Sequence, residues 1–302
     1  MILNNMISPP PLQKGDTIGL VAPSSPLGPG RLETGIPYLE RCGYQVKLGS
    51  HLKDGIRFLA GRDEDRARDI MAFFKDPTIK AIVATAGGSG STRLLSLLDY
   101  DVITAHPKIL TGFSDTTGLS LGIYAKTGLV TYSGFTFRDT ETGQPDPLIH
   151  DTFMACLEQR PYQINEGITI HPGQVQGPLI GGTLSLIRSL IGTPYQPHFQ
   201  DAILFFEEVW AEPFQVDEML SQLKLAGIFE QVAGIIIGQF EHCIAHHNPE
   251  RDGTIHDVID EWAARFKVPC LKEFPYGHGN RRCVLPIGKV VSLDATRRIV
   301  QI

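Results

Sequence analysis

The amino-acid sequence predicts an α/β fold whose N-terminal part is a doubly wound parallel sheet. Short apolar runs alternate with segments of helical periodicity over about 130 residues, which is typical of parallel strands joined by helices. Most of the runs are continuous and largely apolar, as expected for strands that are buried on both faces. Three of the loops that follow them are rich in Gly, Ser or Pro, and ligands bind such sheets outside the carboxyl ends of the strands. We therefore expect a functional site where these three loops meet.

The elements of this first part follow from the same patterns. We predict strands at 17–22, 44–48, 81–85, 109–111 and 128–132, and helices at 30–42, 63–74, 91–98 and directly after residue 115. The three loops are PSSP at 23–26, AGGSG at 86–90 and GFSD at 112–115. Each comes directly after an apolar run, so all three are predicted at one edge of the sheet.

A polar stretch, RDTETGQPDP at 138–147, breaks the pattern and predicts a domain boundary. We place the first domain at 1–140 and the second at 141–302. The second reads as a smaller mixed α/β domain. Its predicted strands lie at 162–170, 174–179, 202–206 and 232–240, its helices at 183–191, 214–225 and 254–265, and a hairpin near 293–296.

Composition narrows the classes of function. A chain of 302 residues with 42% hydrophobic residues has material for two domains, and its net charge of −6 argues against nucleic acid or an anionic membrane as a partner. Five dispersed cysteines with no CxxC pair indicate reduced thiols. The first residues have no signal-peptide pattern, and no apolar stretch reaches 18 residues. We expect a soluble, cytoplasmic protein.

Ser114 is the first candidate catalytic residue. It stands in Gly112-Phe113-Ser114-Asp115, between an apolar run and a helical segment. A nucleophile elbow places its serine on such a strand-to-helix turn. The motif is not G-x-S-x-G, and Ser and Asp are also favoured as helix N-caps. Locally, a capped helix start is the more common meaning of this pattern.

Three other motifs each allow two or more interpretations. The loop Gly87-Gly88-Ser89-Gly90 can be a phosphate cradle, a tight turn or a source of N–H groups for an oxyanion, and it lacks the spacing of a nucleotide-binding loop. Glu207 and Glu208 end an apolar strand, where both can be solvated, which we favour for Glu208. His278 lies between two glycines, either on a mobile surface loop or as a catalytic base.

A group of histidines raises the question of a metal site. The residues concerned are Glu241, His242, His246, His247, Asp252 and His256. Their spacing matches no zinc signature, so we predict no metal. We single out none of the cysteines as a nucleophile.

Several long blocks in a fixed order resemble the LD-carboxypeptidase family of serine peptidases, which includes the microcin immunity proteins. The blocks are GDTIGLVAPSSP (15–26), GGSGSTRLL (87–95), LTGFSDTTGLSL (110–121), PLIGGTLSLIRSLIGTPYQP (178–197), ILFFEEVWAEPFQVDEMLSQL (203–223) and FPYGHGNRRCVLPIG (274–288). They cover nearly the whole chain, which makes the resemblance highly specific.

The resemblance implies a catalytic triad and a reaction. Ser114 would be the nucleophile, His278 the base and Glu207 the residue that orients the base. The backbone N–H groups of Asp115 and Gly88 are the candidates for stabilising the oxyanion. The family implies an L,D-carboxypeptidase that releases the terminal D-alanine of cytoplasmic muropeptide tetrapeptides in peptidoglycan recycling. It also implies an active site between the two domains, a homodimer, and no metal or cofactor.

Departures from the family pattern concern the substrate. Ala86 and Ser89 replace an Arg and an aromatic or polar residue beside the two glycines, Thr183 replaces an Asn, and Glu218 replaces an Arg. A carboxypeptidase must hold a carboxylate, so a cation other than one at position 86 is expected.

Two alternatives remain open. A microcin-immunity-type hydrolase of peptidyl or aminoacyl nucleotides needs an aromatic residue to stack a base, and Trp210 alone is close in sequence to the proposed triad. A non-catalytic peptide- or anion-binding α/β protein is the alternative of another class.

Overall fold

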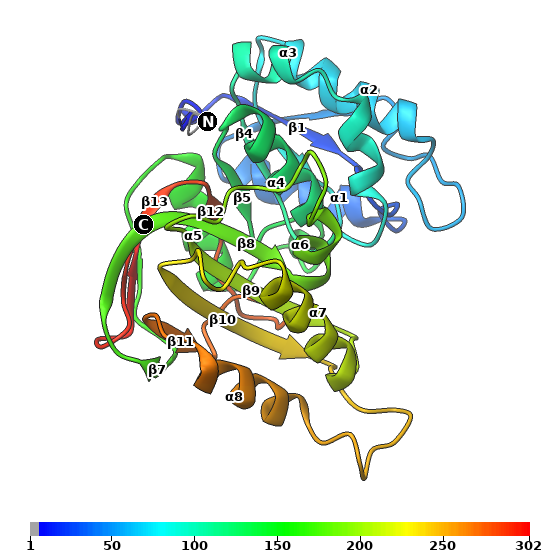
Figure 1. The fold of residues 1–302 in the computed structure, drawn as a ribbon. Helices are drawn as coiled ribbons and strands as arrows, with labels where there is room; N and C mark the ends of the chain where they lie inside the picture. The colour runs from blue at the N-terminus through cyan, green and yellow to red at the C-terminus, as the bar shows by residue number, and fades with distance from the viewer. Residues whose placement is uncertain (1–5) are drawn as a thin grey trace. The chain divides into compact units, whose positions relative to one another are not determined.

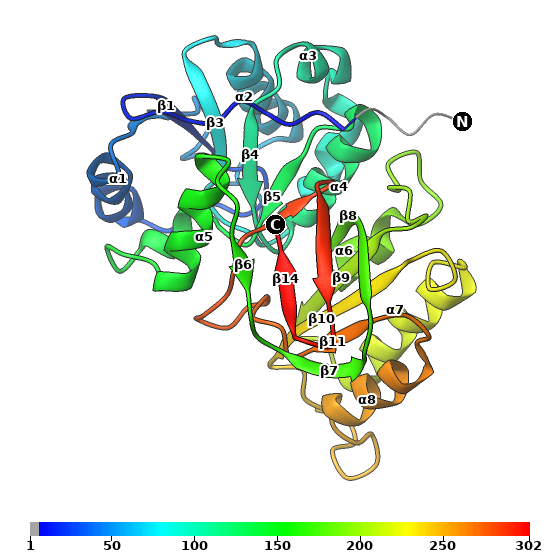
Figure 2. The same cartoon turned by 90° about the vertical axis from the view of Figure 1, so that its left-hand side faces the viewer.

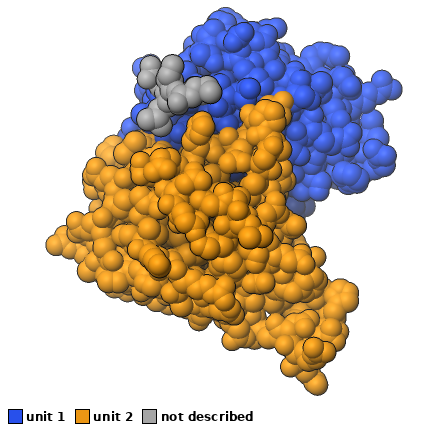
Figure 3. Space-filling model, in the orientation of Figure 1, with its two compact units in different colours: residues 1–160, 283–288 blue, residues 161–282, 289–302 orange. Residues whose placement is uncertain are grey.

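The computed structural model describes residues 6–302, and the contacts within the chain divide it into two units. The first comprises the residues up to Arg160 together with Cys283–Gly288, and the second comprises Pro161–Arg282 and Lys289–Ile302 (Figure 3). The chain therefore returns to the first unit near its C-terminal end. The sequence-based boundary between residues 140 and 141 stays a prediction.

The first unit is built on a sheet of six strands in the order β12-β5-β4-β3-β1-β2 (Figure 1). The strands are β1 (Thr17–Val21), β2 (Gln45–Leu48), β3 (Ile79–Ala84), β4 (Ile109–Gly112), β5 (Thr131–Ser133) and β12 (Leu285–Ile287). All neighbours are parallel except β12, which runs antiparallel to β5. The chain moves from β1 outward to β2 and then back past β1 to β3, so the sheet has a switch point between β1 and β3.

Helices cover both faces of this sheet, as the doubly wound prediction requires. They are α1 (Arg31–Arg41), α2 (Asp63–Lys75), α3 (Tyr100–Ala105), α4 (Thr116–Thr127) and α5 (Pro147–Leu157), with 3-10 turns η1 (Ser91–Leu97) and η2 (Phe137–Thr140). Helix α3 packs against both α2 and α4, and Figure 2 shows α1 on the other side of the sheet. Acidic residues open α2 and Gly128 ends α4 in the left-handed region, as the helix dipole and C-cap preferences lead us to expect.

Two elements of the first unit depart from the sequence prediction. The segment predicted as a helix at 91–98 is the 3-10 helix η1. Helix α5 was not predicted; it begins at the end of the polar stretch 138–147, where Asp146 accepts a hydrogen bond from the Leu148 N–H and Pro147 occupies the first turn. Asp before Pro at a helix start is a favoured pair, so the signal for α5 was present in the sequence.

The second unit is built on a mixed sheet of eight strands in the order β6-β14-β13-β8-β9-β10-β11-β7. The strands are β6 (Gln163–Ile164), β7 (Ile168–His171), β8 (Gln174–Thr183), β9 (Ile203–Val209), β10 (Gly234–Glu241), β11 (Cys270–Lys272), β13 (Val290–Asp294) and β14 (Ile299–Gln301). Strands β8 to β11 are parallel to one another, and the remaining pairs are antiparallel. Three helices accompany the parallel part, namely α6 (Leu184–Leu190), α7 (Pro213–Leu225) and α8 (Ile255–Arg265).

The predicted fold class is confirmed: the chain has an α/β fold with a doubly wound first unit and a mixed second one. Strands β11 and β12 were not predicted. Within residues 6–302, every helix is too short or too polar to span a bilayer.

Candidate active site

Ser114 occupies a strained turn between β4 and α4 of the first unit. Its φ of 63° lies in the left-handed region, which costs a non-glycine residue about 1–2 kcal/mol. Every neighbour from Lys108 to Ile123 is buried, whereas Ser114 is partly exposed. A buried strand, a left-handed serine and a helix that starts at Thr116 are the features of a nucleophile elbow. The alternative of a plain capped helix start does not explain the left-handed backbone.

The glycine loop after β3 lies directly against this turn. A Cβ atom on Gly87 would stand 2.8 Å from the Ser114 Cβ and 3.1 Å from the Phe113 carbonyl oxygen, so only glycine fits there. Gly88 has a φ of 117°, and a Cβ on it would clash with the Ser25 hydroxyl group at 2.0 Å. The loops after β1, β3 and β4 therefore meet at one edge of the sheet, as the sequence predicted.

The Asp115 side chain joins these three loops. Its carboxylate accepts hydrogen bonds from the Ser24 Oγ at 2.5 Å, the Ser91 N–H at 2.8 Å and the Gly90 N–H at 3.1 Å. Its backbone oxygen also accepts a bond from the Ser91 Oγ at 2.6 Å. The suggestion that the Asp115 side chain caps the helix is wrong, because it makes no capping bond to α4. The carboxylate instead fixes the backbone around Ser114.

The Arg66 side chain is hydrogen-bonded to two of the same loops. Its side chain is almost fully buried, donates to the carbonyl oxygens of Pro23 and Gly90, and pairs with Asp63. A buried cation is costly unless it is paired and hydrogen-bonded. Arg66 was not predicted to have a role, and the Asp115 carboxylate was predicted only as a helix cap, because the loop groups that they bind lie 24 to 91 residues away in sequence.

Glu207 and His278 form a hydrogen-bonded pair in the second unit. The Glu207 side chain is fully buried near the end of β9, and its Oε2 lies 2.6 Å from the His278 Nδ1. The carboxylate therefore favours the tautomer that carries its proton on Nδ1, which makes Nε2 the basic nitrogen. The alternative of a solvated Glu207 is wrong, because its side chain has no exposure to solvent, and the His278 side chain is 19% exposed and hydrogen-bonded to Glu207.

Thr183 completes the carboxylate's contacts. It is the cross-strand partner of Glu207 at the end of β8, and its Oγ1 donates to the Glu207 Oε1 at 2.6 Å. Both carboxylate oxygens are thus engaged, one by a hydroxyl group and one by the imidazole. A polar residue after Gly181-Gly182 at a strand end was the only sequence signal for this role.

Close backbone contacts hold the His278 loop. A Cβ on Gly238 of β10 would stand 2.2 Å from the Tyr276 carbonyl oxygen and 3.1 Å from the Glu207 Cβ. A Cβ on Gly277 would stand 2.8 Å from the Gln239 Cβ. The glycines let the loop lie flat on β10, which brings His278 to the end of β9.

Glu208, which we predicted to be solvated, is buried. It is 3% exposed and accepts hydrogen bonds from the Ser185 N–H at 2.7 Å and the Val209 N–H at 2.9 Å. Burial raises the pKa of this carboxyl group above its usual value. The prediction was wrong because we assumed that a residue at a strand end is exposed to solvent. The first turn of α6 covers Glu208 instead.

The histidines at 242–256 do not gather into a metal site. The Glu212 carboxylate accepts bonds from the His246 and His247 N–H groups and contacts the His247 Nδ1 at 2.5 Å. His242 stacks on the exposed Trp210 with 4.3 Å between ring centres. These residues organise a loop of the second unit.

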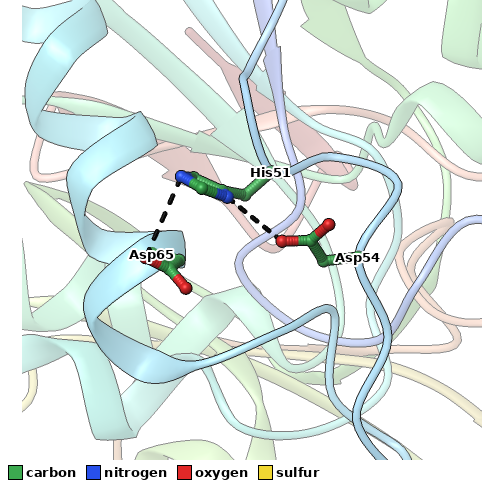
Figure 4. A group of neighbouring side chains, drawn as sticks. All are labelled: His51, Asp54 and Asp65. Carbon is green, nitrogen blue, oxygen red and sulfur yellow. Dashed lines mark hydrogen bonds and ion pairs between the residues drawn. The ribbon is translucent and has the colours of Figure 1, made fainter.

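Among the described residues, one group has the composition of a metal site: His51, Asp54 and Asp65. Figure 4 shows the two carboxylates on opposite sides of the imidazole ring. Asp54 lies 3.1 Å from Nδ1 and Asp65 lies 3.9 Å from Nε2, and Arg68 already pairs with Asp65 at 2.6 Å. One ligand atom from each residue lies within 4.8 Å of the others, and Asp65 is already engaged by Arg68, so the present contacts are those of an ion-pair cluster.

Comparison with known proteins identifies the family. Residues 18–134 match the model of the LD-carboxypeptidase N-terminal domain, and residues 176–293 match that of the C-terminal domain. The chain is 35% identical to a probable murein peptide carboxypeptidase of Bacillus subtilis, covering 96% of this chain and 92% of the relative. It belongs to the LD-carboxypeptidase family. The predicted resemblance is confirmed, and the protein is a hydrolase of the peptidase class.

Solved structures of the LD-carboxypeptidase family have the same fold. One is MccF in complex with glutamyl sulfamoyl guanosine, with a TM-score of 0.88, 28% identity and 97% coverage of both chains. Another is a muramoyltetrapeptide carboxypeptidase from Oxalobacter formigenes, with a TM-score of 0.84, 25% identity and coverage of 94% and 97%. The structural relatives thus include MccF and a muramoyltetrapeptide carboxypeptidase, which correspond to the two kinds of hydrolase considered from the sequence.

Proposed function

We propose that this protein is a serine L,D-carboxypeptidase that releases the terminal D-alanine from muropeptide tetrapeptides. The observation that carries the proposal is the Thr183–Glu207–His278 chain of hydrogen bonds, with a fully buried carboxylate behind the imidazole. This is the arrangement that activates a nucleophile in a serine hydrolase. Ser114, on its left-handed turn, is the proposed nucleophile.

In the proposed reaction, the Ser114 Oγ attacks the carbonyl carbon of the scissile bond while the His278 Nε2 takes its proton. Glu207 stabilises the imidazolium that forms. The backbone N–H groups of Asp115 and Gly88 stabilise the oxyanion, each worth about 3–4 kcal/mol of the barrier. His278 returns the proton to the leaving amino group of D-alanine. Water then hydrolyses the acyl-enzyme, with His278 again acting as base. These steps use no metal or cofactor.

We further propose that the protein acts in the cytoplasm as a homodimer, on muropeptides rather than on nucleic acid or membranes. The acidic net charge argues against nucleic acid and anionic membranes as partners. Light scattering of the purified protein measures its oligomeric state, and a monomeric mass would contradict the dimer.

Mass spectrometry of the free tetrapeptide incubated with purified protein tests the reaction. We expect loss of one alanine with the wild type, and a fall in rate of more than about 10⁴-fold for Ser114→Ala. Ser96→Ala, at an exposed position of η1, is the matched control and should keep full activity. Wild-type protein that leaves the tetrapeptide intact over hours would contradict the proposal.

A second candidate function is hydrolysis of aminoacyl nucleotides, as in a microcin immunity protein. The favouring observation is Trp210, which is 71% exposed, stacks on His242 and has a left-handed φ of 64°. An exposed indole can stack a nucleobase. Faster turnover of an aminoacyl sulfamoyl adenylate than of the tetrapeptide would favour this function. If neither compound is turned over, a non-catalytic binding protein becomes the better assignment.

A further inference from the structure

The segment after β5 crosses the carboxyl edge of the first sheet. The Gly134 N–H donates to the Gly112 carbonyl at 3.0 Å, the Thr111 Oγ1 donates to the Phe135 carbonyl at 3.3 Å, and the Arg138 N–H donates to the Thr85 carbonyl at 2.9 Å. The chain thus passes over the end of β4 and reaches the end of β3. Arg138 is therefore placed beside the residues that lead into Gly87, which packs on Ser114.

Most guanidinium groups near this edge already have a partner at hydrogen-bond distance. Arg93 is held by Asp63 at 2.9 Å and 2.7 Å, and Arg31 is held by Glu141 at 2.6 Å. Arg66 is buried beneath the loops, where it donates to two carbonyl oxygens. The charges of Arg93 and Arg31 are thus already offset by a carboxylate at hydrogen-bond distance, and Arg66 is out of reach of a substrate because it is buried.

Arg138 differs from them. Its side chain is 59% exposed, and its ion pair with Glu141 is long, at 3.8 Å from Nε. The same Glu141 oxygen is bonded to Arg31 at 2.6 Å, so its charge is largely offset by another cation. The backbone of Arg138 thus lies at the edge that carries Ser114, and its side chain is a largely exposed positive charge.

We propose that the Arg138 guanidinium binds the C-terminal carboxylate of the peptide substrate. The inference rests on the proposed carboxypeptidase function, since that reaction requires recognition of a free carboxylate. A guanidinium group matches a carboxylate with two parallel N–H···O bonds, which selects the acid over a neutral end. Arg138 sets the specificity, and Ser114, Glu207 and His278 carry out the chemistry.

The test compares two substrates of the same tripeptide acyl group. One is the tetrapeptide with its free terminal carboxylate, and the other is a thioester whose leaving group is uncharged, so that it lacks the terminal carboxylate. We expect Arg138→Ala to raise KM for the tetrapeptide by about 10- to 100-fold, the loss of a charge-assisted bond, with kcat changed little. For the Arg138→Lys variant we expect a KM for the tetrapeptide between those of the wild type and of Arg138→Ala. Turnover of the thioester should stay at the wild-type level in both variants.

Arg62→Ala is the control, because Arg62 is another exposed arginine of the first unit. A normal KM for Arg138→Ala, or a raised KM for Arg62→Ala instead, would overturn the assignment while leaving the carboxypeptidase function intact. An equal loss on both substrates would show that Arg138 acts on folding, and would also overturn it. If the wild-type protein does not release D-alanine, the proposed function is contradicted, and the role proposed for Arg138 is contradicted as well.

Discussion

At the scale of single residues, the clearest feature is a carboxylate whose two oxygens have different partners. Glu207 has no exposure to solvent, so its charge depends on Thr183 and His278. Hydrogen bonds to a charged group contribute about 1.5–3 kcal/mol, more than those between neutral groups. The Thr183 hydroxyl group should therefore help to orient the His278 imidazole, although it binds Glu207 and not His278 itself.

Replacing Thr183 by valine tests this role. The change keeps the shape but removes the donor to the Glu207 Oε1. We expect kcat for the tetrapeptide to fall by about 10- to 100-fold with KM changed less, since the lost bond acts on Glu207 and through it on His278. Thr183→Ser keeps a hydroxyl group and should retain most of the activity. A Thr183→Val enzyme with a wild-type kcat would show that the bond does not support the base.

Residue types at the ends of apolar runs were useful for choosing candidates, and the structure pairs two of the residues chosen, Glu207 and His278. Ser114, Glu207 and His278 were all selected from such positions or from a glycine-rich loop. Burial was harder to predict. Glu208 looks equivalent to Glu207 in the sequence, yet each meets different neighbours: the Thr183 hydroxyl group for Glu207 and the first turn of α6 for Glu208. Only the register of β8 against β9 decides this, and register is not visible in a single sequence.

At the scale of elements, long periodic segments were predicted well and short ones poorly. Helices α2, α7 and α8 lie within one or two residues of their predicted ranges, because each has several turns of apolar spacing. Strands β11 and β12 have three residues each, too few for any pattern. β12 even contains Pro286, which is tolerated because β12 is an edge strand.

The packing of β8 against β9 gives a prediction at this scale. A Cβ on Gly181 would stand 1.8 Å from the Phe205 carbonyl oxygen of the neighbouring strand, so the two strands would have to separate. We expect Gly181→Ala to lower the free energy of unfolding by at least about 3 kcal/mol, or to prevent folding. Urea denaturation followed by circular dichroism measures the effect.

Gly55→Ala is the matched control. A Cβ on Gly55 meets nothing within 4 Å, and its backbone is not in the left-handed region. The substitution should be neutral or stabilising by up to about 1 kcal/mol, because alanine restricts the unfolded chain. Equal stability of both variants would mean that the close approach at Gly181 is easily relaxed.

At the scale of the whole molecule, the five thiols report on burial in both units. Cys156, Cys243, Cys270 and Cys283 are buried, whereas Cys42 is partly exposed. Burial raises the pKa of the thiols of Cys243 and Cys270 to about 12. A protonated, buried thiol is a poor nucleophile. Iodoacetamide at pH 8 should therefore modify Cys42 first, and the other four only after denaturation, as counted by mass spectrometry.

The same thiols predict a dependence on alkaline pH. A thiol whose pKa rises from 9.0 to about 12 on folding stays protonated in the native state while the unfolded chain ionises. Its contribution to stability is complete below pH 9 and is lost as the pH rises toward 12. Cys270→Ala should lose stability less steeply over that range. Native Cys270 that is alkylated as fast as Cys42 would contradict the burial on which both predictions depend.

The return of the chain to the first unit has a consequence for synthesis on the ribosome. β12 pairs with β5, yet roughly 130 residues separate Arg160 from Ile287. At typical rates of ~5–20 residues per second, translating them takes on the order of ten seconds. During that interval the nascent first sheet ends in the unpaired edge of β5, a surface open to pairing with other strands. Molecular chaperones that shield strand edges would thus act on the β5 edge during translation, before β12 has been synthesised.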